Sequence, residues 1–256
     1  MPAKDTCFMA EVGKPEVRDY FNRRRGGFLG QKDEIKSIER RYAVLGSFAL
    51  GWKEDTITGY FSKVKKSRDR TNIFYVNLAD AKLYYVRSGL FSRKPTVEES
   101  DFVEKIVDLP PKALEFLSDI MKGGSITYRD LNKKHFLFLD GNPDMMMILR
   151  TRDLIYVEPK FSGTEYSAKM NMPALDSRKY NLGSLLPTEG KDLADSEKDA
   201  AKYKPEDILW HLEAALQGKG EFSGLVYLPY DRCTYTDAEG RSRYVKLIAP
   251  KFSAKT

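Results

Sequence analysis

The stretch LPPKALEFLSDIMKGGSITYRDLNKK, from Leu109 to Lys134, decides the fold at the centre of the chain. Its apolar residues recur every three or four positions, which predicts a helix, and Gly123-Gly124 ends that helix because glycine accepts a positive φ without a steric penalty. Thr127 and Asp130 then have the spacing of a capping box, in which each side chain accepts a free backbone amide hydrogen at a helix start. Two short helices are therefore predicted.

The next residues predict a third helix and a hairpin. The segment NPD, 142–144, supplies an N-cap, a proline at the first helical position and an acid favoured by the helix dipole. The segments LIYV, 154–157, and YSAKM, 166–170, read as two strands joined through a Ser-Gly loop. The order helix, helix, helix, hairpin predicts a winged helix over 109–172.

The flanking segments predict two further units that each combine a helix with an antiparallel sheet. Residues 1–95 form a basic unit of this kind, and residues 204–256 form a second, which is consistent with a divergent repeat. Residues 96–108 are an acidic connector, and residues 173–203 have the composition of a linker. The predicted fold class is α+β, with a central winged helix flanked by the two units.

The net charge of +6 is concentrated in the first third of the chain, where basic residues exceed acidic ones by nine. The densest run, KVKKSRDR at 63–70, is expected at a strand end and hairpin loop, where it can attract phosphate groups. A solvated face that keeps the protein soluble is the other explanation for such clusters. The predicted nucleic-acid contacts are Lys63, Lys65, Lys66, Arg68, Arg70, Lys133, Lys134, Arg150, Arg152 and Lys160.

The third predicted helix is poorly suited to reading bases in DNA. Readout in the major groove needs Arg, Lys, Asn or Gln near the helix start, whereas this helix has Asp144 followed by three methionines. Contacts to the phosphate backbone need only positive charge, so weakly sequence-selective DNA binding remains expected. A protein adaptor that uses the winged helix and its adaptable methionines is the open alternative.

A second alternative uses some of the same residues for chemistry. The pattern PD, an apolar run and EPK, which includes Asp144, Glu158 and Lys160, resembles the PD…ExK pattern of restriction-type nucleases. That resemblance implies that the two acids bind Mg²⁺ or Mn²⁺ and that the lysine stabilises charge at the attacked phosphate. It requires a strand at 144–150, whereas the cap residues favour a helix.

A broader resemblance covers most of the chain. The segments GKPEVRDYF, TNIFYVNLADAKLYYV and LVYLPYDRCTY, together with the predicted winged helix, resemble the accessory region that follows the motor in archaeal HerA/FtsK-like ATPases. The resemblance implies a cytoplasmic, non-enzymatic module of a DNA-translocating or DNA-processing machine, with DNA and a motor ATPase or another DNA-processing subunit as partners. This chain has no GxxxxGK[ST] motif, so ATP hydrolysis is not expected of it.

Other signals are few. The chain has two cysteines and two histidines, with no CxxC, HExxH, GxSxG or GxGxxG pattern, so neither a zinc site nor a cofactor is predicted. No apolar run approaches the roughly 20 residues that cross a bilayer. We therefore expect a cytoplasmic protein without a membrane partner.

Overall fold

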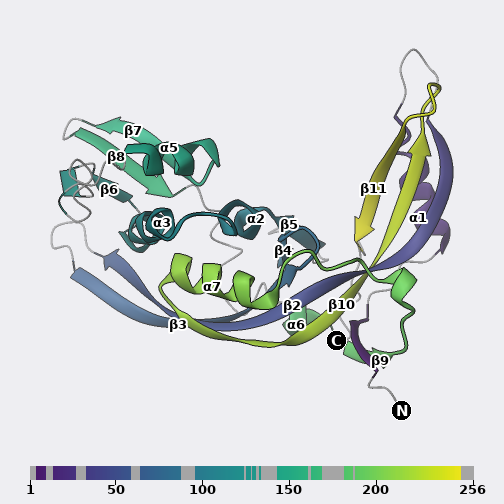
Figure 1. Ribbon diagram of the computed structural model, residues 1–256, viewed down its shortest axis with the longest axis horizontal. Helices are drawn as coiled ribbons and strands as arrows, with labels where there is room; N and C mark the ends of the chain where they lie inside the picture. The colour runs from purple at the N-terminus through teal and green to yellow at the C-terminus, as the bar shows by residue number, and fades with distance from the viewer. Residues whose placement is uncertain are drawn as a thin grey trace.

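The fold was analysed in a computed structural model of the chain (Figure 1). The residues that it describes are 4–9, 14–26, 33–58, 64–87, 96–123, 125–127, 129–130, 133, 143–160, 163–168, 182–186 and 188–248.

A sheet of eight strands forms the body of the molecule. Its order is β5-β4-β3-β2-β10-β1-β9, and β11 pairs with β10 beside this path. All described pairs are antiparallel except β1 with β10. The strands are Asp5–Phe8 (β1), Glu34–Thr58 (β2), Val64–Asn77 (β3), Leu83–Arg87 (β4), Thr96–Ser100 (β5), Thr188–Lys191 (β9), Lys219–Thr236 (β10) and Ser242–Ile248 (β11).

The long strands β2 and β10 join the two ends of the chain. They pair from Gly51 opposite Lys219 to Glu34 opposite Thr236. The prediction of two separate helix-plus-sheet units, 1–95 and 204–256, is therefore wrong, because strands from both segments belong to one sheet. The residue patterns identified the strands, but nothing local in them specified which distant strand each would pair with.

The predicted connector and linker are also structured. Residues 96–108 contain β5 and the helix α2 (Phe102–Ile106). Residues 173–203 contain α6 (Leu182–Leu185), β9 and the 3₁₀ helix η3 (Asp195–Glu197). Their polar and acidic composition reflects exposed positions on short elements, because all four residues of β9 are exposed while its backbone pairs with β1.

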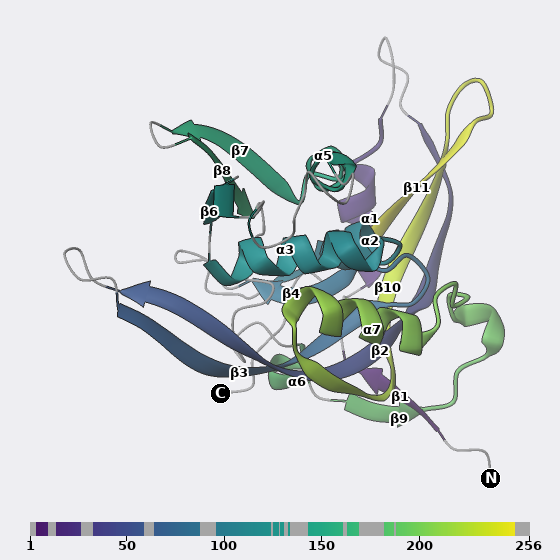
Figure 2. The same ribbon diagram turned by 60° about the vertical axis from the view of Figure 1, so that its left-hand side comes forward.

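Three helices cover one face of the sheet, as Figures 1 and 2 show. These are α2, α3 (Pro111–Gly123) and α7 (Pro205–Leu216), and together with the strands beneath them they form the central body. The side chains of Phe116, Leu117 and Leu212 are fully buried in this core. Gly220 leaves room for the neighbouring strand and for α7, because a Cβ there would lie 2.6 Å from the backbone oxygen of Ala49 on β2 and 3.2 Å from Cδ1 of Leu209 on α7.

A smaller core lies at one end of the sheet. Helix α1 (Lys14–Asn22) packs there against β11 and the adjoining parts of β2 (residues 34–42) and β10 (residues 230–236), and we call this part the blade (Figure 1). Its buried side chains are Val17, Phe21, Cys233, Tyr235 and Leu247.

In the central stretch of the sequence, the first and third predicted helices and the predicted hairpin are present. Helix α3 is followed by β6 (Ser125–Thr127), helix α5 (Pro143–Thr151) and the hairpin β7 (Ile155–Lys160) and β8 (Gly163–Ala168). We call β6, the helical residues 129, 130 and 133, α5, β7 and β8 the wing unit, in which the three strands have the order β6-β8-β7. The prediction that the methionine run is helical is confirmed, whereas β6 was not predicted. Asn142, the expected cap of α5, lies outside the described residues.

The predicted capping pair is also present in part. The hydroxyl of Thr127 accepts a hydrogen bond of 3.1 Å from the backbone N–H of Asp130. The Asp130 carboxylate accepts from the same hydroxyl at 2.8 Å. Arg129, Asp130 and Lys133 are helical, and the rest of the predicted second helix lies outside the described residues.

Candidate nucleic-acid interface

Residues 64–70 of the basic run belong to a long β-hairpin rather than to a loop. Residues 64–70 are the first half of β3 and pair with residues 52–58 of β2. Lys63 lies outside the described residues, and only the backbone is described at Lys65 and Lys66. Arg68 is exposed and Arg70 is half-buried. The predicted loop is therefore wrong for 64–70, because the ladder continues to Thr58 opposite Val64.

The register of this hairpin places acidic residues opposite basic ones. Asp69 lies opposite Lys53, and Glu54 lies opposite Arg68. Opposite charges on directly paired residues attract each other, so part of the positive charge is compensated within the hairpin. The paired segments 52–58 and 64–70 together contain five basic and three acidic residues, so a positive excess remains.

Alternation along β3 places its basic positions on a defined face. Positions 66, 68 and 70 share a face with Asn72, because side chains alternate along a strand. Asn72 lies opposite Leu50, which is buried in the core beneath α7. These three positions therefore lie on the face of the sheet that carries the helices. The wing unit lies at the same end of the molecule as this hairpin in both views (Figures 1 and 2).

The wing unit presents basic side chains of its own. Arg150 on α5 and Lys133 are exposed, and neither has an ion pair or hydrogen bond with any residue that the structure describes. Arg129 is exposed as well, although sequence reasoning did not select it. A basic residue two positions after a predicted N-cap is a signal that could have identified it. Lys134 lies outside the described residues.

Lys160 occupies the end of β7, opposite Gly163 at the start of β8. The backbone of Lys160 therefore lies at the tip of the hairpin, which is consistent with the predicted wing. Its side chain lies outside the described residues.

Arg152 has a different role from the one predicted. Its guanidinium forms a bidentate ion pair with Asp108, including a 3.0 Å bond from Nη2, and it donates 2.9 Å to the backbone oxygen of Lys105. The hydrogen bonds from Arg152 hold the pKa of the Asp108 carboxyl below its usual value. The predicted phosphate contact at Arg152 is therefore wrong, because its guanidinium already donates to Lys105 in α2 and to Asp108 just after that helix.

The nuclease pattern lacks the strand that it requires. Asp144 lies within helix α5, whereas Glu158 and Lys160 lie on β7. The side chains of all three are outside the described residues. Within the described part of the chain, no group of three His, Cys, Asp or Glu side chains is placed to hold a metal ion.

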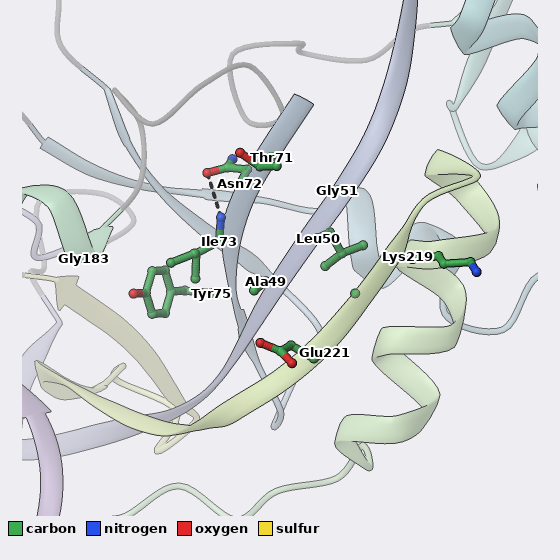
Figure 3. Close-up of a pocket in the computed structure, with 11 residues that line it drawn as sticks. Ala49, Leu50, Gly51, Thr71, Asn72, Ile73, Tyr75, Gly183, Lys219 and Glu221 are labelled. Atoms are coloured by element: carbon green, nitrogen blue, oxygen red, sulfur yellow. Dashed lines mark hydrogen bonds between the residues drawn. The ribbon is translucent and has the colours of Figure 1, made fainter. Parts of the chain in front are cut away.

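A shallow groove lies on the opposite face of the sheet, and Figure 3 shows the residues that line it. It has a volume of about 780 Å³, and it includes Ala49, Thr71, Ile73 and Glu221 from the adjacent strands β2, β3 and β10. The missing Cβ of Gly220 would point toward α7, so its neighbour Glu221 lies on the other face.

The chemistry of this groove is limited. Burial raises the pKa of Tyr75, and the amide oxygen of Asn72 accepts a hydrogen bond of 2.9 Å from the backbone N–H of Ile73. A nucleophile paired with a base is not found among these lining residues. The groove can accept a ligand by contact but offers no evident catalytic group.

The two cysteines lie in separate cores. Cys7 is buried between strands of the large sheet, and Cys233 is buried in the blade. Burial raises the pKa of both thiols, so they stay neutral and unreactive.

Searches for similar proteins found no matching family model, no matching curated protein and no matching solved structure. Among the helices in the described ranges, none combines the length and the apolar character needed to cross a membrane.

Proposed function

We propose that this chain is a nucleic-acid-binding accessory module that contacts the phosphate backbone with its wing unit and with the β2–β3 hairpin. The observation that carries the proposal is the exposure of Arg150 and Lys133 on the wing unit, at the end of the molecule where β3 also presents basic positions. In this proposal, α3 and the wing unit together form a winged helix. The resemblance to the accessory region of HerA/FtsK-like ATPases suggests a DNA-translocating motor as its protein partner.

The chemistry of the exposed side chains favours backbone contact over base reading. The outward face of α5 carries Met147, which is 62% exposed, together with Arg150 and Thr151. Methionine has no strong donor or acceptor for the edge of a base, whereas an arginine bonds phosphate oxygens in any sequence. Binding should therefore depend on salt far more than on sequence.

The test compares the variant Arg150→Ser/Lys133→Ser with a control variant, Lys204→Ser/Lys219→Ser. All four residues are exposed, and both variants remove two positive charges. Fluorescence anisotropy with a labelled duplex gives the affinity at several salt concentrations. Each phosphate contact that is lost should lower the slope of log K against log salt by about one, so the first variant should lose about two and the control almost nothing. Equal slopes for the two variants would contradict the proposal.

A divalent metal in the same assay checks the nuclease alternative. The proposal expects the duplex to stay intact with Mg²⁺ or Mn²⁺. Cleavage that requires the metal and disappears in Asp144→Ala would replace the accessory function with an enzymatic one.

A protein adaptor is the second candidate, and the exposure of two large side chains on the wing unit favours it. Met147 is 62% exposed and Tyr156 is 39% exposed, and such side chains are common anchors of protein interfaces. The uncharged change Met147→Ser separates the candidates. The adaptor function predicts that a partner captured by the wild-type chain is lost, whereas the nucleic-acid function predicts unchanged affinity for the duplex.

A further inference from the structure

Four arginines gather at the end of α1, away from the wing unit and the β2–β3 hairpin. Arg23, Arg24 and Arg25 follow the last residue of α1, and Arg243 reaches the same place from β11. Two hydrogen bonds connect Arg243 to this turn, 2.8 Å to the carboxylate of Asp33 and 3.0 Å to the backbone oxygen of Arg24. No local pattern in the sequence connects Arg243 with the other three arginines, because they meet only when β11 pairs with β10 beside α1.

The contacts fix the guanidinium groups without using all of their donors. The Nε of Arg25 donates 2.9 Å to the backbone oxygen of Asp33. The guanidinium of Arg24 lies 3.6 Å from the centre of the Tyr20 ring, which is a cation–π contact. Each guanidinium has five N–H donors, so most donors of Arg24 and Arg25 have no partner among the described residues. Arg23 has no side-chain hydrogen bond or ion pair within the described ranges.

The charge of the cluster is strongly unbalanced. Among the described residues, the one acid that forms an ion pair with it is Asp33, which faces Arg243. Gly26 permits this close packing, since a Cβ there would lie 2.9 Å from the Asp33 carboxylate and 3.0 Å from Arg243. The dipole of α1 favours cations beyond its last turn, which accounts for part of the arrangement. It does not account for Arg243, which comes from a strand.

A separate groove lies beside α1. It has a volume of about 440 Å³ and is lined by Val17, Arg18, Ile38, Arg40 and Asp231. Arg40 is neutralised by two hydrogen bonds to Asp231, at 2.8 and 3.1 Å. Arg18 is exposed and has no ion pair in the described structure. It precedes Arg23 by five residues, which corresponds to roughly 7.5 Å along a helix axis at 1.5 Å per residue. Arg18 therefore adds a positive charge beside this groove that no described acid neutralises.

We propose that the arginine cluster of Arg23, Arg24, Arg25 and Arg243 is a second phosphate-binding site, and that its ligand is the phosphodiester backbone of a nucleic acid. Several guanidinium groups in a row suit successive phosphates of a chain better than a single phosphorylated side chain. The identity of the ligand rests on the proposed function, whereas the phosphate site itself does not.

The first experiment titrates the full chain with inorganic pyrophosphate and follows backbone amide signals by NMR. Saturable shifts are expected at Arg24, Gly26 and Asp33. The variant Arg23→Ser/Arg24→Ser removes two exposed side chains that are outside the buried core, and it should weaken binding at least about tenfold, as expected when charge-assisted bonds are lost. The control Lys204→Ser/Lys219→Ser should bind as the wild type does. Absent shifts, or equal binding by both variants, would overturn the site.

The second experiment measures duplex binding against salt with the same variants. Arg23→Ser/Arg24→Ser should lower the slope by about two. If it does so while Arg150→Ser/Lys133→Ser has no effect, the site stands and the wing-unit contact fails. If pyrophosphate binds but neither duplex nor single-stranded slopes change in Arg23→Ser/Arg24→Ser, a nucleic acid is the wrong ligand and this identification is overturned.

Discussion

The central body and the blade are stabilised by different interactions, although β2 and β10 run through both. The body buries many large apolar side chains beneath three helices, and Phe116 and Leu212 have no exposed surface. The blade has only five buried residues in its core and is surrounded by ion pairs such as Arg40 with Asp231 and Arg232 with Glu39. We therefore expect the stability of the body to respond little to salt and the stability of the blade to depend on charge, although the two share one continuous sheet.

The largest expected effect is in the body. Phe116→Ala removes a fully buried ring at the centre of α3 and should lower the free energy of unfolding by about 3–5 kcal/mol. Urea denaturation measures this change, and the loss should be the same in low and high salt. Ile73→Ala is the control, because Ile73 is 39% exposed. Equal losses for the two variants would show that α3 does not stabilise the body as described.

A smaller effect is expected in the blade. The Tyr235 hydroxyl donates a buried hydrogen bond of 2.7 Å to the backbone oxygen of Phe21, and burial raises the pKa of this tyrosine to about 12. Tyr235→Phe removes one of the two hydrogen bonds to that oxygen, which still accepts from the backbone N–H of Arg24 at 3.0 Å, so the cost should be about 0.5–1.5 kcal/mol. Amide hydrogen exchange should then quicken in α1 and β11 and stay unchanged in α3. Faster exchange throughout the body would mean that the two regions unfold as one unit.

The ion pair between the wing unit and the body should give a pH-dependent effect. Arg152 lowers the pKa of Asp108 in the folded state, so the pair stabilises the protein above the unfolded-state pKa of aspartate, and the contribution is lost as pH falls through the lowered folded-state pKa. Arg152→Met should cost about 1 kcal/mol at neutral pH, because the Asp108 side chain is largely exposed. The difference from wild type should become smaller in acid, where only the bond from Arg152 to the backbone oxygen of Lys105 remains to be lost. A difference that does not change with pH would assign the effect to that bond or to packing of the arginine stem.

The smallest effect is expected at the surface of the blade. Arg232 donates 2.9 Å to Glu39 across the β2–β10 ladder and lowers the pKa of that carboxyl. Glu39→Gln should cost only about 0.5 kcal/mol, because both side chains are partly exposed. Thermal melts in low and high salt provide the measurement, and the difference between variant and wild type should disappear in high salt. A loss that salt does not change would contradict the electrostatic account of the blade.

Local signals in the sequence predicted local structure well. Pro143 begins α5, and the Thr127–Asp130 pair caps the residues after β6, because these contacts lie within four residues of each other. The α+β class followed from such signals. The wing-unit basic residues Lys133 and Arg150 were likewise selected from the sequence and are exposed.

The missed features all depend on distant partners. Arg152 has the charge of a phosphate ligand, but its pairing with Asp108 joins positions 44 residues apart. The linker prediction failed because β9 gains order from pairing with β1, and its own residues carry no strand pattern. The cluster at the end of α1 depends on Arg243, 210 residues from Asp33.

The pairing of β2 with β10 has a consequence for how the chain is made. Arg40 meets Asp231 across an interval of 191 residues, so β2 leaves the ribosome long before its neighbour exists. During that interval one edge of a strand of 25 residues lacks its native partner, and such an edge invites aggregation. Folding dominated by contacts of this separation is slow. We therefore expect chaperone dependence during synthesis and insoluble product from chains cut before β10.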